Sequence, residues 1–194
     1  MFENKIISAI QNSIETKKAI LYDQVLLNTI SEVASAIIRA YKNDKKVLLC
    51  GNGGSAADAQ HLAAELTGRF YFDRDPLFAE ALHVNTSYLT AVANDYSYDE
   101  VYSRLVKAKG AKGDILIGIS TSGNSVNIIK AFEQAKITGM TTVGFTGETG
   151  GKIKELSDYL INVPSKDTPR IQEAHILIGH IICELVEKEL FKHD

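Results

Sequence analysis

The chain has few of the features that mark a membrane or secreted protein. Its 194 residues include only two cysteines, Cys50 and Cys183, which lie far apart and form no CxxC pair, so free reduced thiols are favoured over a disulfide. No segment approaches the ~20 consecutive apolar residues that a membrane span needs. The first residues lack the apolar run and the small-residue cleavage site of a signal peptide. These absences predict a soluble, cytoplasmic protein with no membrane partner.

The chain also lacks a strong excess of either positive or negative charge. The 21 basic and 24 acidic residues give a net charge of −3 and form no block of like charge. Proteins that bind nucleic acid usually carry a basic patch or stripe, so we expect no nucleic-acid partner. Internal repeats, low-complexity tracts and proline-rich linkers are missing too, and 194 residues suit one well-buried domain better than two.

What the sequence does contain is a regular alternation of apolar patterns. Apolar residues recur at helical spacing over residues 3–19 and 24–42, and short apolar runs then alternate with helical patterns. The expected strands are residues 47–50, 79–84, 114–120, 141–145 and 159–163, and the expected helices are residues 55–68, 88–108, 125–138, 150–157 and 169–191. Such alternation predicts right-handed βαβ units and a parallel sheet that is buried on both faces.

The predicted fold is therefore α/β, a three-layer sandwich in which helices flank a five-stranded parallel sheet. We expect a single domain over residues 1–194, with an N-terminal helical pair in residues 1–44 and the α/β core in residues 45–194. The helical pair suits either packing within the monomer or oligomerisation, and the sequence does not decide between them.

Two loops at strand ends are suited to bind an anion. The first, GNGGS at residues 51–55, has glycines that let backbone amides approach a ligand, and the helix after it offers unpaired N–H groups. Ser55 with Asp58 also fits a helix-capping pattern, so this signal is in part that of a helix start. The second loop, STSGNS at residues 120–125, places hydroxyl groups around one glycine at another helix start. Hydroxyls and amides can hold a phosphate there without lysine or arginine.

Two nucleotide-binding patterns are incomplete. GNGGSA at residues 51–56 matches G-x-G-x-x-G/A, but the second expected strand ends in His83-Val84-Asn85, without the carboxylate that would bind a ribose. GFTGETGGK at residues 144–152 has Thr146 where a P-loop needs its first glycine, and Ile153 where it needs a hydroxyl for magnesium. We therefore expect no nucleotide cofactor.

Two pairs of polar side chains lie on the predicted helices. His61 and Glu65 are four residues apart and share a helix face, although a surface pair has the same spacing. Gln172 and His180 are eight residues apart, about 80° round the last helix, and can face one region. His180 lies in the apolar segment ILIGHIIC, where a histidine is more often a packed core residue than a catalyst. The remaining histidines are expected to be structural or exposed (His175), to serve packing (His83) or to lie in the tail (His193).

These side chains suggest two kinds of chemistry. If Glu65 and His180 meet across a phosphate pocket, they form an acid–base pair suited to moving a proton between adjacent carbons of a sugar through an enediol. His61, Glu65, Gln172 and His180 could also bind a divalent metal ion. Glutamine is a weak ligand, but two imidazoles and a carboxylate resemble the set that holds a catalytic zinc ion.

Longer motifs extend this interpretation to a family. The segments CGNGGSAADAQHLAAELTGR (50–69), AVANDYSYDEVYSR (91–104), GDILIGISTSGNS (113–125) and TPRIQEAHILIGHIICELVEKEL (168–190) together resemble bacterial phosphoheptose isomerases, or sedoheptulose-7-phosphate isomerases, of the sugar isomerase (SIS) fold. The resemblance runs along nearly the whole chain. It implies a homotetramer with active sites at subunit interfaces. The implied reaction converts D-sedoheptulose 7-phosphate to D-glycero-D-manno-heptose 7-phosphate, the first step toward the heptose of surface polysaccharide.

The resemblance also implies a role for each matching residue. Glu65 would act as the base and His180 as the acid, and one zinc ion per subunit would be held by His61, Glu65, Gln172 and His180. The implied substrate contacts are Asn52, Gly53, Gly54, Ser55, Glu65, Asn94, Asp95 and Gln172, with Ser120, Thr121, Ser122 and Ser125 holding the phosphate.

The chain departs from the family pattern at three places. Asn85 stands where the family often has an acidic residue, Ser97 stands where a glycine is common, and the segment Asp73-Arg74-Asp75-Pro76 is one residue longer than in some relatives. These departures bear on the choice of sugar more than on the class of reaction.

Three other functions compete with this one. The closest is isomerisation of a different phosphosugar. A second is the non-catalytic SIS protein that binds the bacterial replication initiator, which lacks the acid–base pair found here at Glu65 and His180. A third is the sugar-phosphate sensor of transcriptional regulators, but the first 45 residues contain no basic cluster that would bind DNA. The acid–base pair favours the enzyme.

Overall fold

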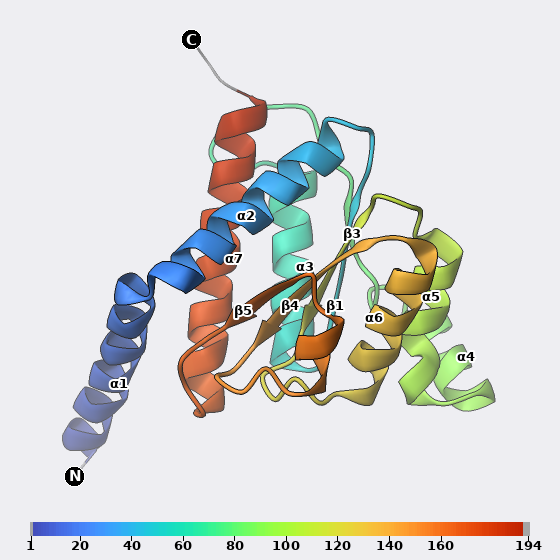
Figure 1. Cartoon of the computed structure of the whole chain (residues 1–194). Coiled ribbons are helices and arrows are strands. Elements are labelled where there is room, and N and C mark those ends of the chain that lie inside the picture. Colours follow the sequence, from blue (N-terminus) through green and yellow to red (C-terminus); the bar gives the residue numbers. More distant parts are fainter. Residues whose placement is uncertain (1, 192–194) are drawn as a thin grey trace.

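Five strands, all of them short apolar runs, pair in parallel in the order β2-β1-β3-β4-β5 (Figure 1). They are β1 Val47–Gly51, β2 Ala79–Ala81, β3 Ile115–Ile119, β4 Thr141–Thr146 and β5 Tyr159–Asn162. The computed structural model describes residues 2–191, so residues 1 and 192–194, with the expected tail residue His193, lie outside the described part. The predicted five-stranded parallel sheet is confirmed.

Helices cover both faces of this sheet, which makes the predicted three-layer sandwich (Figure 1). One face carries α2 Gln24–Tyr41, α3 Gly54–Thr67 and α7 Thr168–Leu190, and the other carries α4 Thr86–Asp95, α5 Val101–Lys109 and α6 Val126–Thr138. Because side chains alternate along a strand, β1 sends Val47 and Leu49 into the first layer and Leu48 and Cys50 into the second. All four of these side chains are fully buried.

Three expected elements differ from the structure. The helix expected over residues 88–108 is broken into α4, a short 3₁₀ turn η1 (Tyr98–Glu100) and α5. The helical segment expected at residues 150–157 is a 3₁₀ turn, η2 (Lys152–Leu156), because the glycines before it adopt positive φ. The second strand ends at Ala81 instead of residue 84.

The two N-terminal helices have different surroundings. Helix α2 packs its apolar side into the core, with Ile30, Val33 and Ile37 among its buried residues. Helix α1 (Phe2–Tyr22) extends beyond the sheet (Figure 1), and only Thr16 and Ile20 are buried along it. Packing within the monomer therefore holds for α2, whereas α1 leaves most of its apolar side chains exposed.

Cys50 and Cys183 are both buried and free, as the sequence predicts. They belong to the cores on opposite faces of the sheet. Among the described residues, no helix is both long enough and apolar enough to cross a membrane.

Candidate active site

The two candidate loops follow neighbouring strands at the centre of the sheet. The loop of residues 51–55 follows β1, and the loop of residues 120–125 follows β3, which pairs with β1. The strand order reverses direction between these two strands. In open parallel sheets, ligands bind beyond the carboxyl ends of the strands at such a reversal. The fold therefore places both loops where a ligand is expected.

The glycine-rich loop brings its backbone close to the start of α3. Gly53 has a φ of +56° and is the N-cap of α3, with no side-chain hydrogen bond to the helix. The expected capping role of Ser55 is wrong, because Ser55 lies inside the first turn and is 4% exposed. Among the described residues no side chain caps this helix end. The N–H groups of Ser55 and Ala56 donate to the carbonyls of Asn52 and Gly53, which leaves the Gly54 N–H to an anion.

An amide pair joins the glycine-rich loop to α6. The side chains of Asn52 and Asn127 exchange two hydrogen bonds of 2.9 Å, and the Tyr98 hydroxyl donates to Asn52 Oδ1 at 3.1 Å. Asn127 is buried, and Tyr98 lies in η1, within the unpredicted break between α4 and α5. Neither Asn127 nor Tyr98 was expected at the site. The only signal for Asn127 is an amide within the otherwise apolar start of a helix.

The serine-rich loop has a similar construction. Ser120 and Ser125 lie 3.0 Å apart (Oγ to Oγ), and Ser122 Oγ accepts the backbone N–H of Asn124. Ser120 is buried, whereas Ser122 is exposed. Ser125 is the N-cap of α6 but makes no capping hydrogen bond with its side chain, so in the described part this helix also begins with free N–H groups.

A second glycine turn supports the serine-rich loop. Gly123 has a φ of +66°, and a Cβ there would overlap the carbonyl oxygen of Gly150. The backbone N–H of Gly147 donates to the Thr121 carbonyl at 2.9 Å, and that of Ile153 donates to the Gly123 carbonyl at 3.1 Å. The GFTGETGGK segment therefore braces the loop. A cavity of about 280 Å³ opens between them, lined by Thr121, Ser122, Asn124, Gly147, Glu148, Thr149, Ser165, Lys166, Thr168 and Ile171.

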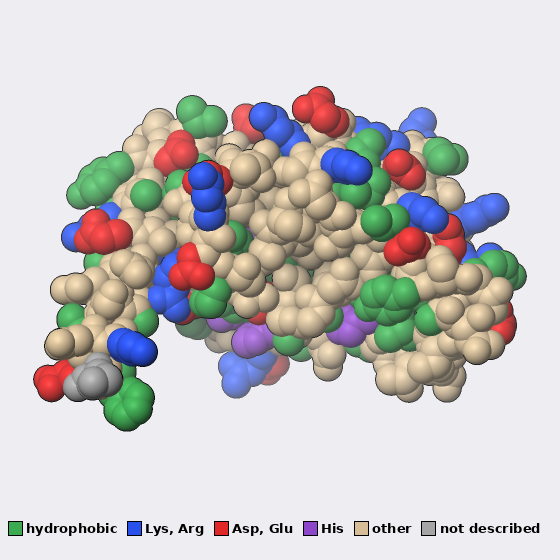
Figure 2. Space-filling view, turned by 90° about the horizontal axis from the view of Figure 1, so that it is seen from below, with side chains coloured by type: hydrophobic (Ala, Val, Ile, Leu, Met, Phe, Trp, Pro, Cys, Tyr) green, Lys and Arg blue, Asp and Glu red, His purple; other side chains and the backbone are tan. Residues whose placement is uncertain are grey.

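His61, Glu65 and His180 form one cluster. The His61 Nε2 atom lies 3.1 Å from Glu65 Oε1 and 3.2 Å from His180 Nε2, and each of the three residues offers a ligand atom within 4.8 Å of the others. Glu65 and His180 are half-buried, while His61 is exposed. Figure 2 looks onto the side of the molecule on which α7 begins, and histidine side chains reach the surface there.

The cluster depends on the close contact of α3 with α7. The contacts of Gly54 with Gln172 and of Leu62 with Gly179 show that the two helices run in the same direction, side by side. A Cβ on Gly179 would lie 2.6 Å from the methyl carbons of Leu62, so glycine next to His180 allows this approach. Two imidazoles and one carboxylate are ligands that suit zinc, and the cluster therefore fits a divalent metal ion.

The other expected site residues lie outside this cluster. The amide of Gln172 faces Gly54 at the start of α3, since a Cβ on Gly54 would lie 2.6 Å from Gln172 Nε2. Eight residues of helix separate Gln172 from His180, a distance of about 12 Å along α7. Asn94 and Asp95 are exposed at the end of α4, where Asn94 Nδ2 donates to Asp95 Oδ1 at 2.9 Å.

His175 is structural, one of the two alternatives expected from the sequence. It is 1% exposed, and its Nε2 atom lies 3.0 Å from the Thr146 carbonyl oxygen. Burial lowers the pKa of His175 to about 4, although the bond to Thr146 opposes the shift. His83 is half-buried, and burial lowers its pKa as well.

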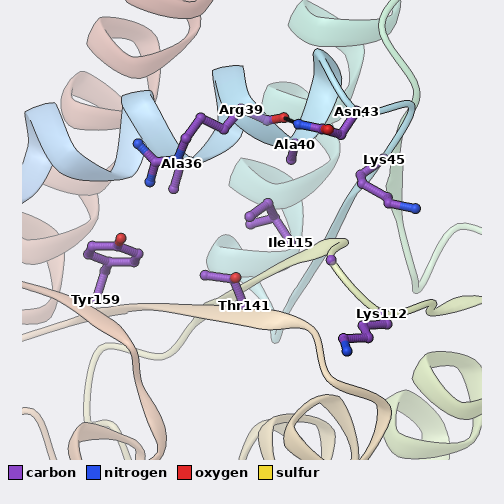
Figure 3. Close-up of a pocket in the computed structure, with 10 residues that line it drawn as sticks. Ala36, Arg39, Ala40, Asn43, Lys45, Lys112, Ile115, Thr141 and Tyr159 are labelled. Atoms are coloured by element: carbon purple, nitrogen blue, oxygen red, sulfur yellow. Dashed lines mark hydrogen bonds between the residues drawn. The ribbon is translucent and has the colours of Figure 1, made fainter.

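A larger cavity, of about 470 Å³, lies at the opposite end of the sheet (Figure 3). Its walls include Ile115 and Thr141, the first residues of β3 and β4, and the basic side chains Arg39, Lys45 and Lys112. It therefore opens at the amino ends of the strands, away from both loops and from the histidine cluster. Its position argues against a role in the chemistry of that cluster.

Several known proteins with similar sequences or structures are described as phosphoheptose isomerases. A family model described as "SIS domain" matches residues 10–147. A phosphoheptose isomerase from Aneurinibacillus thermoaerophilus is 59% identical over 96% of this chain and 94% of its own length. A phosphoheptose isomerase from Clostridium acetobutylicum is 57% identical over 97% and 96%, respectively. The structure of the phosphoheptose isomerase from Neisseria gonorrhoeae is 42% identical, with a TM-score of 0.91 over 97% of this chain and 100% of that chain.

Proposed function

The chain belongs to the phosphoheptose isomerases of the SIS-domain family, and on that premise we propose how its site converts D-sedoheptulose 7-phosphate to D-glycero-D-manno-heptose 7-phosphate. It is an aldose–ketose isomerase of heptose biosynthesis. The observation that carries the mechanism is the meeting of Glu65 on α3 with His180 on α7, together with two strand-end loops whose helices begin without side-chain caps.

The two loops would bind the substrate. The serine-rich loop offers the hydroxyls of Ser120, Thr121, Ser122 and Ser125, together with the free N–H groups of α6, and these suit a phosphate dianion. Residues 52–55 would line the sugar, and Asn94 and Asp95 would contact its hydroxyls. The Asn52–Asn127 amide pair supports this arrangement, because it holds the first loop against α6, which begins at the second.

The proton transfers would be divided between two side chains. Glu65 would remove a proton from C1 of the open-chain ketose and return it to C2. His180 would donate a proton to O2 as the carbonyl becomes a hydroxyl, and it would regain a proton from the O1 hydroxyl as the aldehyde forms. The net change moves one hydrogen from C1 to C2 and one from O1 to O2, and it consumes no co-reactant.

His61, Glu65 and His180 would hold one zinc ion per subunit. Bound there, zinc would supply Lewis-acid polarisation of a substrate oxygen. Gln172 lies about 12 Å from His180 along the same helix. A Gln172 ligand to the same ion would therefore come from a second copy of the chain. This distance supports an active site shared between subunits.

A homotetramer is the assembly that we propose. Helix α1 leaves Ile6, Ile10 and Ile14 exposed at four-residue intervals, and α7 leaves Leu177, Ile181 and Leu185 exposed in the same way. Apolar stripes of this kind are typical of helices that pack against another chain. Free, buried cysteines agree with a cytoplasmic enzyme, whose product would enter surface polysaccharide.

The acid–base pair can be tested directly. We expect Glu65→Gln and His180→Gln each to abolish turnover of sedoheptulose 7-phosphate by the zinc-loaded protein while leaving it folded. Glu184→Gln is the matched control, because Glu184 lies on the same helix, pairs with Lys188 and is not part of the cluster of His61, Glu65 and His180. No turnover by the folded, zinc-loaded wild type would overturn the proposed substrate. Other ketose phosphates, and then binding to the replication initiator, would be tested next.

A further inference from the structure

A buried carboxylate lies two helical turns beyond His180. The side chain of Glu187 is 1% exposed, and seven residues along α7 place it on nearly the same helix face as His180. Its two oxygens accept four hydrogen bonds from the segment of residues 70–74 that follows α3. The donors are the backbone N–H groups of Phe70 (2.8 Å), Tyr71 (2.6 Å) and Phe72 (3.1 Å) and the Nε of Arg74 (3.1 Å).

Arg74 links Glu187 to the end of α3. Its side chain is 2% exposed, and beyond the bond to Glu187 it donates from Nη2 to the backbone carbonyl of Glu65 at 3.0 Å. Its Nη1 donates to the carbonyl of Leu66 at 2.7 Å. The guanidinium therefore satisfies two carbonyls in the last turn of α3, one of them belonging to Glu65 itself.

Phe70 links Glu187 to His180. Its backbone N–H is held by Glu187, and its ring centroid lies 5.7 Å from that of the His180 imidazole. One carboxylate thus holds the backbone of Glu65, through Arg74, and a ring against His180, through Phe70. Burial alone would raise the pKa of Glu187, but the three backbone donors and Arg74 hold that pKa below its usual value. The pair therefore stays ionised at neutral pH.

We propose that the buried Arg74–Glu187 ion pair positions Glu65 opposite His180 and so sets the geometry of the proton-transfer and metal-binding cluster. The inference rests on the proposed function for its kinetic consequences. It also makes a prediction about the cluster itself, independent of the substrate. Neither residue touches the two substrate loops in any bond made by the described residues, so loss of the pair should affect kcat and metal binding more than KM.

Stability alone cannot test this inference, because breaking any buried ion pair destabilises a protein. The chain offers a matched control in Lys46–Asp114, at the amino ends of β1 and β3. The Asp114 carboxylate is also 1% exposed, accepts the Lys46 ammonium at 2.5 Å and holds two backbone N–H groups. We would compare Glu187→Gln with Asp114→Asn in the full-length protein, measuring Tm, zinc affinity by chelator competition, and kcat and KM for sedoheptulose 7-phosphate.

We expect both variants to have a lower Tm than the wild type. Only Glu187→Gln should also have a lower zinc affinity and a lower kcat, each by about 10–100-fold, with little change in KM. The NMR signals of the His180 ring, assigned with His180→Gln, should also shift as the Phe70 ring moves away. If Glu187→Gln does not fold, Arg74→Lys replaces it, because the compact ammonium lacks the planar fork of donors that reaches Glu187 and two carbonyls together.

Two outcomes separate the possibilities. Zinc affinity and kcat equal to those of Asp114→Asn would overturn the inference and leave the pair a structural one. A wild type that binds zinc but does not turn over the phosphosugar would overturn the proposed function. In that case a loss of zinc affinity confined to Glu187→Gln would still support the positioning role.

Discussion

Two histidines in one helix have different roles, because their surroundings differ. His175 and His180 are five residues apart in α7, yet His175 faces the sheet and is 1% exposed, while His180 faces α3 and is half-buried. His175 lies 3.0 Å from a main-chain oxygen. His180 lies 3.2 Å from a second imidazole, that of His61. The first arrangement holds a neutral ring in place, and the second presents nitrogen atoms to a metal ion or a substrate.

The low pKa of His175 predicts a pH-dependent stability. Burial lowers this pKa to about 4, whereas an unfolded histidine titrates near 6.5. Between these values the unfolded chain binds a proton that the folded chain does not. The free energy of unfolding should therefore fall as pH is lowered from about 6.5 to 4, by about 3 kcal/mol from this residue.

His175→Gln tests this prediction, because an amide can still donate to the Thr146 carbonyl but does not titrate. Urea denaturation at several pH values between 4 and 7 should show a weaker loss of stability at low pH for the variant than for the wild type. Equal slopes would mean that His175 is protonated in the folded protein.

The sequence predicts some of these residue roles and misses others for a physical reason. Helix periodicity alone places His61 and Glu65 on one face, and their contact of 3.1 Å confirms it. The bonds of Glu187 to residues 70–74 join positions more than 110 residues apart. Asn127 and Tyr98 likewise reach Asn52 from other elements. Such contacts depend on how helices pack, and spacing along the chain does not reveal them.

At the scale of elements, the parallel sheet was predictable and the break after α4 was not. Short apolar runs bounded by polar residues indicate buried strands directly. The apolar pattern of residues 88–108 continues through the break, so it suggests one helix. In the structure α4 ends at Asp95, and the turn that follows brings Tyr98 to Asn52. The break thus serves the site, which is where local sequence patterns are expected to fail.

The backbone of the serine-rich loop should determine how tightly the protein binds the phosphosugar. Gly123 has a φ of +66°, and a side chain there would overlap the backbone of Gly150. Gly123→Ala must therefore shift two backbones that form the proposed phosphate site. We expect KM for the phosphosugar to rise about tenfold or more, which corresponds to at least ~1.4 kcal/mol of lost binding.

Gly139→Ala is the control for the strain of positive φ alone. Gly139 has a φ of +79° at the C-cap of α6, where the atoms nearest to an added Cβ belong to the flexible side chain of Lys112. This variant should lose about 1 kcal/mol of stability and keep its KM. An unchanged KM in Gly123→Ala would mean that this loop does not hold the phosphate.

At the scale of the whole molecule, α1 is attached to the chain mainly by polar contacts. Ser13 Oγ donates to Glu173 at 2.7 Å, and Arg170 donates both to Glu173, at 2.6 Å, and to the Ala9 carbonyl. These contacts lie at the start of α7, on either side of Gln172. They fix α1 beside that residue while its apolar stripe stays exposed. The monomer therefore presents Gln172 and an apolar helix face together.

Because Gln172 and the apolar stripe of α1 lie together, we expect a change that prevents assembly to weaken zinc binding as well. Ile10 is 56% exposed in the middle of the α1 stripe, and Ile10→Glu would place a charge in any apolar contact made there. We expect this variant to sediment as a smaller species than the wild type in analytical ultracentrifugation. It should also lose zinc affinity, because Gln172 of a second copy would no longer reach the cluster. Ile137→Glu, on the outer surface of α6 and 80% exposed, should change neither property. A variant at Ile10 that dissociates but keeps full zinc affinity would assign the whole metal site to one chain, since His61, Glu65 and His180 would then suffice.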